Sequence, residues 1–204
     1  MSTSMRIGAV YPQTELGGDV GAIKAFAQAA EDLGYDHILA YDHVLAAEHS
    51  DREPALTGPY TETDPFHEPL MMFGYLAGIT SRIEFVTGVI ILPQRQTALV
   101  AKQAADVDLY SGGRLRLGVG VGWNWVEFDA LEVGDYWGRR GARQADQIEL
   151  MRKLWSGELV EHHDTDHTVE RAKLLPAPGR QIPVWFGGFS PPAYDRAANI
   201  GDGF

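Results

Sequence analysis

Four apolar runs decide the fold: HILAYDH (residues 37–43), RIEFVTGV (82–89), LRLGVGVGWN (115–124) and PVWFGG (183–188). Each run is rich in Val, Ile, Leu or Phe, and each ends in glycine or in an ionisable pair. A parallel strand that is buried on both faces needs continuous apolar character, whereas its carboxyl end faces a ligand. The pattern therefore predicts a parallel α/β barrel whose chemistry lies at the carboxyl ends of the strands.

The segments between the runs have the spacing of helices and turns. Strands are predicted at residues 6–10, 37–40, 83–89, 115–119 and 184–186, and helices at 19–33, 68–79, 97–109, 139–155 and 191–199. The loop from residue 42 to about residue 64 is too long for a plain connector, so it predicts a lid or a substrate wall. Residues 158–181 predict an inserted hairpin, and residues 203–204 the start of a sixth strand.

These elements form part of a barrel in a single domain. An eight-stranded (β/α)8 barrel of the TIM type takes about 250 residues. This chain has 204 residues, five predicted strands and the start of a sixth, and no repeat or linker divides residues 1–204. We expect one incomplete barrel domain with open strand edges, and a homo-oligomer, because open edges make a lone monomer unfavourable.

Composition narrows the class of partner. The formal charge is −11 and Lys and Arg do not cluster, so nucleic acid and anionic membranes are disfavoured and a small-molecule substrate is expected. Without cysteine there is no disulfide, thiolate nucleophile or Cys-bound metal. The first ten residues lack the apolar run of a secretion signal, and the apolar stretch at 86–93 is far shorter than the roughly 20 residues of a membrane helix. We expect a cytoplasmic protein without a membrane segment.

Asp42 and His43 directly follow the predicted strand at 37–40 and are the first candidates for chemistry. Histidine can donate or accept a proton near neutral pH, and an adjacent carboxylate can orient or charge it. A capped loop start with a hydrogen-bonded imidazole is the structural alternative. The position at a strand end favours His43 as a catalytic residue.

Glycines mark three further strand ends. The triplet at 87–89 is typical of a bulge or of a ligand that approaches the backbone, and the alternating glycines at 117–122 can present N–H groups to a flat ring or a phosphate. They do not match a G-x-G-x-x-G that opens a helix, so a dinucleotide site is only weakly indicated. Gly187 and Gly188, with Ser190 and the helix that follows, have the form of an anion site. At Gly88 a glycine needed only for packing, and at Gly187 and Gly188 a tight turn, is an equal alternative.

The remaining polar groups give weaker signals. A metal-like cluster consists of His162, His163, Asp164, Asp166 and His167. Its spacing matches no helical H-x-x-x-H pair and a polar hairpin tip explains it as well, so we predict no metal site. Arg95 can add a cation to the site but is interpreted as a solvated arginine. The lysines fall on predicted helices and the hairpin, which disfavours a Schiff-base aldolase.

Longer segments carry a resemblance to a known family. They are YDHV (41–44), TSRIEFVTGVIILPQR (80–95), LYSGGRLRLGVGVGWNWVEFDALEV (109–133), RRGARQADQIELMRKLW (139–155) and PVWFGGFSPPAYDRAANIGDGF (183–204). Together, from Met5 to Phe204, they resemble the bacterial luciferase-like monooxygenases, and most of all the deazaflavin-dependent oxidoreductases among them.

The resemblance implies coenzyme F420, or alternatively flavin mononucleotide (FMN), at the barrel mouth. It implies that a bulge at Gly88 and Val89 contains a non-proline cis peptide bond and backs the cofactor ring. It also places His43 near the substrate as a proton donor or acceptor. The cofactor-binding residues expected from it are Asp42, Thr87, Gly88, Val89, Val121, Gly122, Asn124, Gly187 and Gly188.

Three functions are compatible with this resemblance. The first is an oxidoreductase that transfers a hydride between coenzyme F420 and a small organic substrate. The second is a monooxygenase that uses reduced FMN and dioxygen, and the third is a flavin-binding relative without turnover, suggested by the missing strands six to eight. Trp123 stands where the sugar-phosphate dehydrogenase branch has a catalytic glutamate, so the resemblance implies a more apolar substrate.

Overall fold

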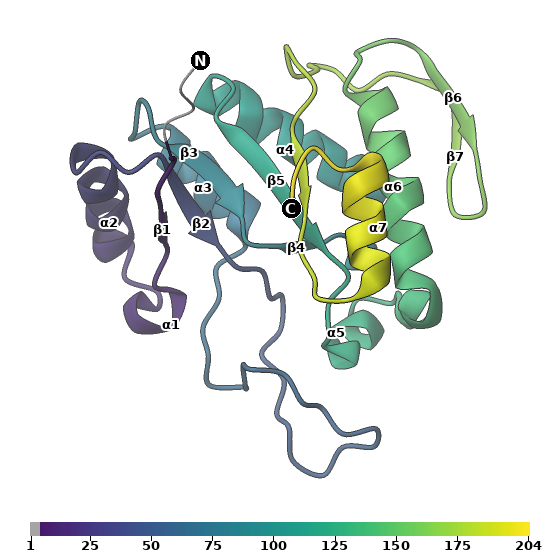
Figure 1. Ribbon diagram of the computed structural model, residues 1–204, viewed down its shortest axis with the longest axis horizontal. Coiled ribbons are helices and arrows are strands. Elements are labelled where there is room, and N and C mark those ends of the chain that lie inside the picture. The colour runs from purple at the N-terminus through teal and green to yellow at the C-terminus, as the bar shows by residue number, and fades with distance from the viewer. Residues whose placement is uncertain (1–4) are drawn as a thin grey trace.

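A mainly parallel sheet runs through the molecule, which is described over residues 5–204 by a computed structural model (Figure 1). Its neighbouring strands are, in order, β1 (Gly8–Val10), β2 (His37–Ala40), β3 (Glu84–Thr87), β5 (Leu115–Gly120) and β8 (Val184–Phe186). The short β4 (Ile90–Ile91) follows β3 and pairs with the carboxyl end of β5. Gly203 bridges Trp185, so the chain starts a further parallel strand beside β8. The described residues form an open part of a barrel.

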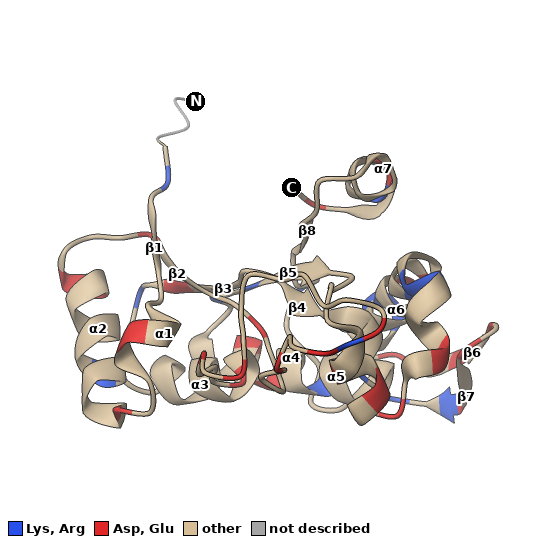
Figure 2. Ribbon diagram, turned by 90° about the horizontal axis from the view of Figure 1, so that it is seen from below, with Lys and Arg blue, Asp and Glu red and all other residues tan. Residues whose placement is uncertain are grey.

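Helices alternate with the strands and cover one side of the sheet. They are α1 (Gln13–Leu16), α2 (Val20–Asp32), α3 (Pro69–Ala77), α4 (Thr97–Ser111), α5 (Trp125–Ala130), α6 (Arg140–Leu154) and α7 (Pro191–Ile200), with 3-10 turns at Leu92–Gln94 and Gly134–Arg139. The strands β6 (Val160–His163) and β7 (Thr168–Ala172) form an antiparallel hairpin. Figure 2 shows α2, α3 and α4 on the same side of the sheet, and over β1, β2 and β3 no described helix covers the other side.

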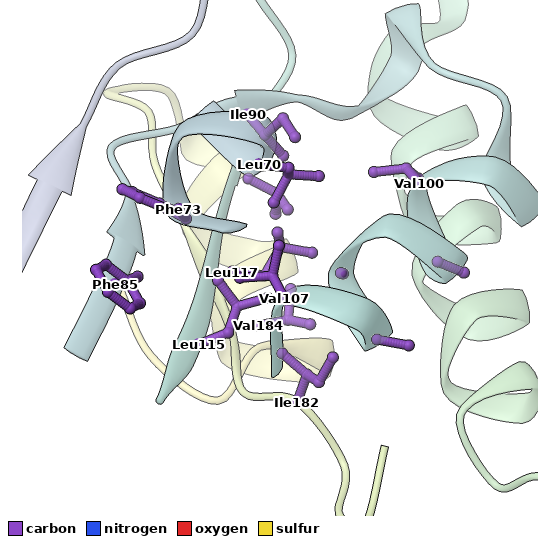
Figure 3. Close-up of a cluster of buried hydrophobic side chains, with 14 of the residues drawn as sticks. Leu70, Phe73, Phe85, Ile90, Val100, Val107, Leu115, Leu117, Ile182 and Val184 are labelled. Atoms are coloured by element: carbon purple, nitrogen blue, oxygen red, sulfur yellow. The ribbon is translucent and has the colours of Figure 1, made fainter. Parts of the chain in front are cut away.

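The core lies between the sheet and these helices (Figure 3). Phe85 on β3 and Leu117 on β5 are fully buried, and they lie opposite α3 and α4. The rings of Phe73 and Phe85 stack with their centroids 5.1 Å apart. Burying such a side chain contributes about 1.5–3 kcal/mol. The helix-covered side of the sheet is therefore well stabilised within this chain.

Local sequence signals set several element ends as expected. The side chain of Asp19 accepts the N–H of Ala22 at 3.0 Å and caps α2. Gly34 follows that helix with φ of 86°, which glycine adopts without steric cost. The strands predicted at 37–40 and 184–186 are confirmed, as is the hairpin within 158–181.

The strand predicted at 83–89 is present but ends earlier than expected, and the predicted cis peptide bond was wrong. The strand stops after Thr87 and resumes as β4, and the cis bonds of residues 5–204 precede Pro54 and Pro176, so the Gly88–Val89 bond is trans. Glycine makes the break possible, because a Cβ at position 88 would lie 2.4 Å from Leu39 Cδ2.

No helix was predicted between the strand at 115–119 and the helix at 139–155, but this segment contains α5 and a 3-10 turn. Asn124 starts α5 by accepting the N–H of Val126 at 3.2 Å. Asparagine is a strong N-cap residue, and this signal outweighs the low helix propensity of the surrounding aromatic and glycine residues.

Candidate active site

The bulge between β3 and β4 lines a cavity of about 810 Å³. Side chains alternate along a strand, so Phe85 faces the helices while its neighbours Glu84 and Val86 line the cavity. The cavity therefore lies on the side of the sheet that the helices leave open. Five of the predicted cofactor residues line it: Thr87, Gly88, Val89, Gly187 and Gly188. Leu39, Val86, Trp185 and Phe186 supply apolar walls.

The side chain of Val89 explains why glycines gather here. A Cβ on Gly120 would lie 2.6 Å from one methyl group of Val89, and a Cβ on Gly187 would lie 2.5 Å from the other. A Cβ on Gly118 would fall 2.0 Å from the carbonyl oxygen of Thr87. The absence of a side chain at these three positions leaves room for the bulge against β5 and the end of β8, so packing explains these glycines. Gly88 itself donates its N–H to the Ala40 carbonyl at 2.6 Å.

The anion site expected after β8 is only partly formed by free backbone groups. The amide of Gly187 donates to the Val119 carbonyl at 2.9 Å and is not available to a ligand. Gly188 has φ of 145° and leads to Ser190, which starts α7 without a side-chain cap bond. What remains for an anion is the loop at Gly188, which lines the cavity, because the helix start offers no free amide: residues 191 and 192 are prolines, and the N–H of Ala193 donates to the Ser190 carbonyl at 2.9 Å.

The carboxylate of Asp42 is turned into the protein. It accepts the N–H of Ile91 at 2.8 Å and pairs with Arg95 at 2.8 Å, and Arg95 also pairs with Glu68 at 3.0 Å. Burial raises the pKa of Asp42, while the guanidinium of Arg95 and the Ile91 N–H act against that shift. The interpretation of Arg95 as solvated was wrong, because its side chain is only 13% exposed and is held by two carboxylates.

His43 is paired with Glu127, a residue that lies on α5. The imidazole Nδ1 is 3.1 Å from one carboxylate oxygen of Glu127, and the other oxygen accepts the N–H groups of Val44 and Leu45 at 2.7 and 3.0 Å. Burial acts to raise the pKa of Glu127, but the hydrogen bonds from His43 and these backbone groups outweigh it and lower the pKa. An ionised Glu127 requires the proton on Nδ1 of His43, and this leaves Nε2 as the reactive nitrogen.

The other residues predicted around the cofactor ring lie apart from the large cavity. Asn124 is buried, and its side chain is used to cap α5. Gly122 has φ of 75° and lies against Ile91, where a Cβ would be 2.7 Å from a methyl group. Val121 precedes it and is half-buried. Their role in cofactor binding stays a prediction.

The histidine cluster of the hairpin is bonded into the fold. Asp164 accepts from both His162 and His167, at 2.8 and 2.9 Å. Burial acts to raise the pKa of Asp164, but these hydrogen bonds lower it to about 2. The ammonium group of Lys153 lies 3.0 Å from Nδ1 of His162, and Thr97 lies 2.6 Å from Nε2 of His167. A metal ion here would face the charge of Lys153.

Comparison with known proteins identifies the family. A sequence model described as luciferase-like monooxygenase matches residues 2–204. The chain belongs to the luciferase-like monooxygenase family.

An uncharacterised protein of Mycobacterium tuberculosis is 34% identical to this luciferase-like chain over 176 residues, which are 84% of this chain and 60% of that protein. The FMNH2-dependent dimethylsulfone monooxygenase of Pseudomonas fluorescens is 25% identical over 205 residues, covering 99% of this chain and 51% of that enzyme. A solved structure of an F420-dependent secondary alcohol dehydrogenase, in complex with an F420–acetone adduct, has a TM-score of 0.76 at 22% identity and covers 98% of this chain and 57% of that one.

This luciferase-like chain therefore spans about half to three fifths of the length of the relatives it matches. The likeness to the solved structure confirms the luciferase-like barrel fold, of which the described residues form the open part noted above. The family contains oxidoreductases and monooxygenases with F420-dependent and FMN-dependent members. No helix of the described residues is long and apolar enough to cross a membrane.

Sequence reasoning missed several residues around His43 of this luciferase-like chain. Glu127 was not identified because no helix was predicted in its segment, although Asn124 followed three residues later by a glutamate is a helix-start signal. Tyr60 and Phe66, which pack on His43, lie in and just beyond the long loop, where no periodicity points to contacts. Only the fold brings these residues together.

Proposed function

We propose that this chain belongs to an oxidoreductase that passes a hydride between coenzyme F420 and a small organic substrate, with His43 as the group that handles the proton. The observation that carries the proposal is the pairing of His43 with the buried Glu127 just beyond the carboxyl end of β2. A histidine whose Nδ1 is fixed by a carboxylate presents Nε2 in a single orientation, as general acid–base catalysis requires. The F420-dependent relatives support the choice of cofactor.

The large cavity suits a flat cofactor ring. Its volume of about 810 Å³ falls within the usual range of ligand sites. Gly88 presents bare backbone on one wall, and Leu39, Val86 and Trp185 present apolar surface on the others. Thr87, Gly88 and Val89 would hold the ring, and the loop at Gly188 would hold its phosphate.

The chemistry divides between the cofactor and the chain. When bound, coenzyme F420 supplies or accepts a hydride at C5. His43 donates a proton from Nε2 to the substrate oxygen when a carbonyl is reduced, or accepts it when an alcohol is oxidised. Glu127 stabilises the charged imidazole and holds its orientation.

A second candidate is an FMNH2-dependent monooxygenase that uses dioxygen. It is favoured by the dimethylsulfone monooxygenase, which aligns with 99% of this chain. In this reaction the same pair, His43 and Glu127, would move a proton to or from the oxygenated product. Product formation that requires dioxygen would select this candidate over the first.

The first experiment is a titration of the chain with coenzyme F420 and, separately, with FMN, followed by cofactor fluorescence. Binding of one cofactor shows that these strands suffice for its site and chooses between the two reactions. Turnover is then measured with a panel of carbonyl compounds. We expect His43→Ala to reduce turnover by about 10²–10⁴-fold with unchanged cofactor affinity. Unchanged turnover in this variant would contradict the proposed role of His43. Cofactor binding without any redox chemistry would favour the third function, a flavin-binding relative without turnover.

A further inference from the structure

Aromatic rings enclose the imidazole of His43. The ring centroids of Phe66, Trp123 and Tyr60 lie 4.9, 5.4 and 5.5 Å from that of His43, each at a steep interplanar angle. The side chain of His43 is only 9% exposed. A cavity of about 290 Å³ lies beside it and is lined in part by Phe66. Aromatic rings at these distances favour flat or apolar partners over water.

Trp123 fixes the loop that carries two of these rings. Gly58 lies so close to the indole that a Cβ at this position would be 2.0 Å from the ring. The ring centroid of His49 lies 5.9 Å from that of Trp123, and Nε2 of His49 is hydrogen-bonded to the carbonyl of Tyr60 at 2.8 Å. The loop of residues 42–67 therefore packs against the segment between β5 and α5. This packing requires glycine at position 58, because any larger residue would clash with Trp123.

The rim of this enclosure is acidic. Glu62 and Asp64 line the cavity beside His43, and Glu15 lines a neighbouring cavity of about 310 Å³ that shares Phe66. Among the described residues that line these two cavities there is no lysine or arginine. Like charges disfavour the approach of an anion to these two cavities.

We propose that the enclosure beside His43 selects an uncharged or cationic substrate with a flat, apolar body and rejects anions such as phosphorylated or carboxylated compounds. Trp123, which packs against Gly58 and His43, is a positioning residue that holds the loop forming the cavity, and Glu62 contributes the charge discrimination. The inference rests on the proposed function for the reaction at His43, but the recognition depends only on residues of this chain.

Three probes of the same shape test the charge preference: benzaldehyde, 4-formylbenzoate and 4-(trimethylammonio)benzaldehyde. Their binding is measured by isothermal titration calorimetry at low ionic strength, with and without bound cofactor. We expect the neutral and cationic probes to bind about tenfold more tightly than the carboxylate. Equal or tighter binding of the carboxylate overturns the proposal, and so does the absence of binding by all three probes.

Two variants with matched controls locate the preference. Gly58→Ala displaces Trp123 and should weaken benzaldehyde binding by about tenfold, whereas Gly179→Ala, where a Cβ meets nothing within 4 Å, should not. Trp123→Leu keeps apolar volume without the ring and should have a similar effect. Glu62→Lys should strengthen binding of 4-formylbenzoate by about threefold, and Glu161→Lys on the exposed face of β6 should leave it unchanged.

The outcomes separate this inference from the proposed function. Cofactor binding and turnover without any difference between the probes, or between Gly58→Ala and Gly179→Ala, would overturn the inference alone. Selective binding of the neutral and cationic probes by a chain that takes up neither cofactor would support the inference and overturn the proposed function. Circular dichroism melting of each variant shows whether a loss of binding is a loss of folding.

Discussion

One side of the sheet is covered by helices of the described residues, and the other side is largely open (Figure 2). On the side of α3 and α4, Phe73, Phe85 and Leu117 are fully buried by contacts within the described residues. On the other side the strands carry charged groups: Arg116 pairs with Glu84 at 3.0 Å and lies over the ring of Trp185 at 4.4 Å. The first side stabilises the fold, whereas residues of the second side line the large cavity. Stability and cofactor binding are therefore expected to respond to different residues.

The largest expected effect is the loss of a ring on the helix-covered side. Phe73→Ala leaves a hole opposite Phe85 and should lower the free energy of unfolding by about 3–5 kcal/mol. Urea unfolding followed by circular dichroism measures it. Met71→Ala on the exposed face of α3 is the control and should change stability little, since that side chain is 72% exposed. Similar losses in the two variants would contradict the difference between the sides.

A smaller effect on activity, with little effect on stability, is expected at the junction of β2 and α5. Glu127→Gln keeps the shape of the side chain but removes the charge that faces His43. We expect kcat/KM for the best substrate of the carbonyl panel to fall about 10–100-fold, mainly through kcat, while cofactor affinity is retained. An unchanged kcat in a variant that melts like the parent protein would contradict a role of Glu127 in holding His43.

Acid should loosen the hairpin, which lies on the side of α6. Asp164 has its pKa lowered to about 2 from 3.8, so the unfolded chain takes up this proton first as the pH falls. The stability that Asp164 provides is complete above about pH 4 and is lost as the pH falls through about 2. In this window Asp164→Asn should make the free energy of unfolding depend less steeply on pH, by the equivalent of up to about one proton taken up on unfolding. Asp32→Asn, at the exposed end of α2, should leave the slope as it is, and equal slopes in all three proteins would contradict the assignment.

How much of this could be predicted from the sequence depends on the range of the signals. The strands at 37–40 and 184–186 and the start of α2 are set by local apolar runs and by the Asp19 cap, so they were predicted correctly. The position of His43 near a strand end was also predicted from the sequence. Its pairing with Glu127 could not be predicted, because the two residues are 84 positions apart and meet only when α5 forms.

Arg95 shows the same limit in electrostatics. Sequence alone gives an arginine its most common environment, which is solvent. The fold instead places Asp42 and Glu68 on either side of it, from two segments distant in sequence. The glycines at 118 and 120 illustrate the opposite case, where a motif that suggested a ligand is explained by the close approach of the bulge.

The smallest expected effect is on the open side of the sheet and completes the comparison. Trp185→Leu removes the ring beneath Arg116 but keeps apolar surface next to Gly203, so the free energy of unfolding should fall by about 0.5–1 kcal/mol. Trp185→Phe retains a ring and should lie closer to the parent protein. Because the ring lines the large cavity, Trp185→Leu should weaken cofactor binding more than Phe73→Ala does in protein that remains folded. A loss of stability as large as that of Phe73→Ala would mean that the open side carries a core of its own, and that the two sides do not divide folding from binding.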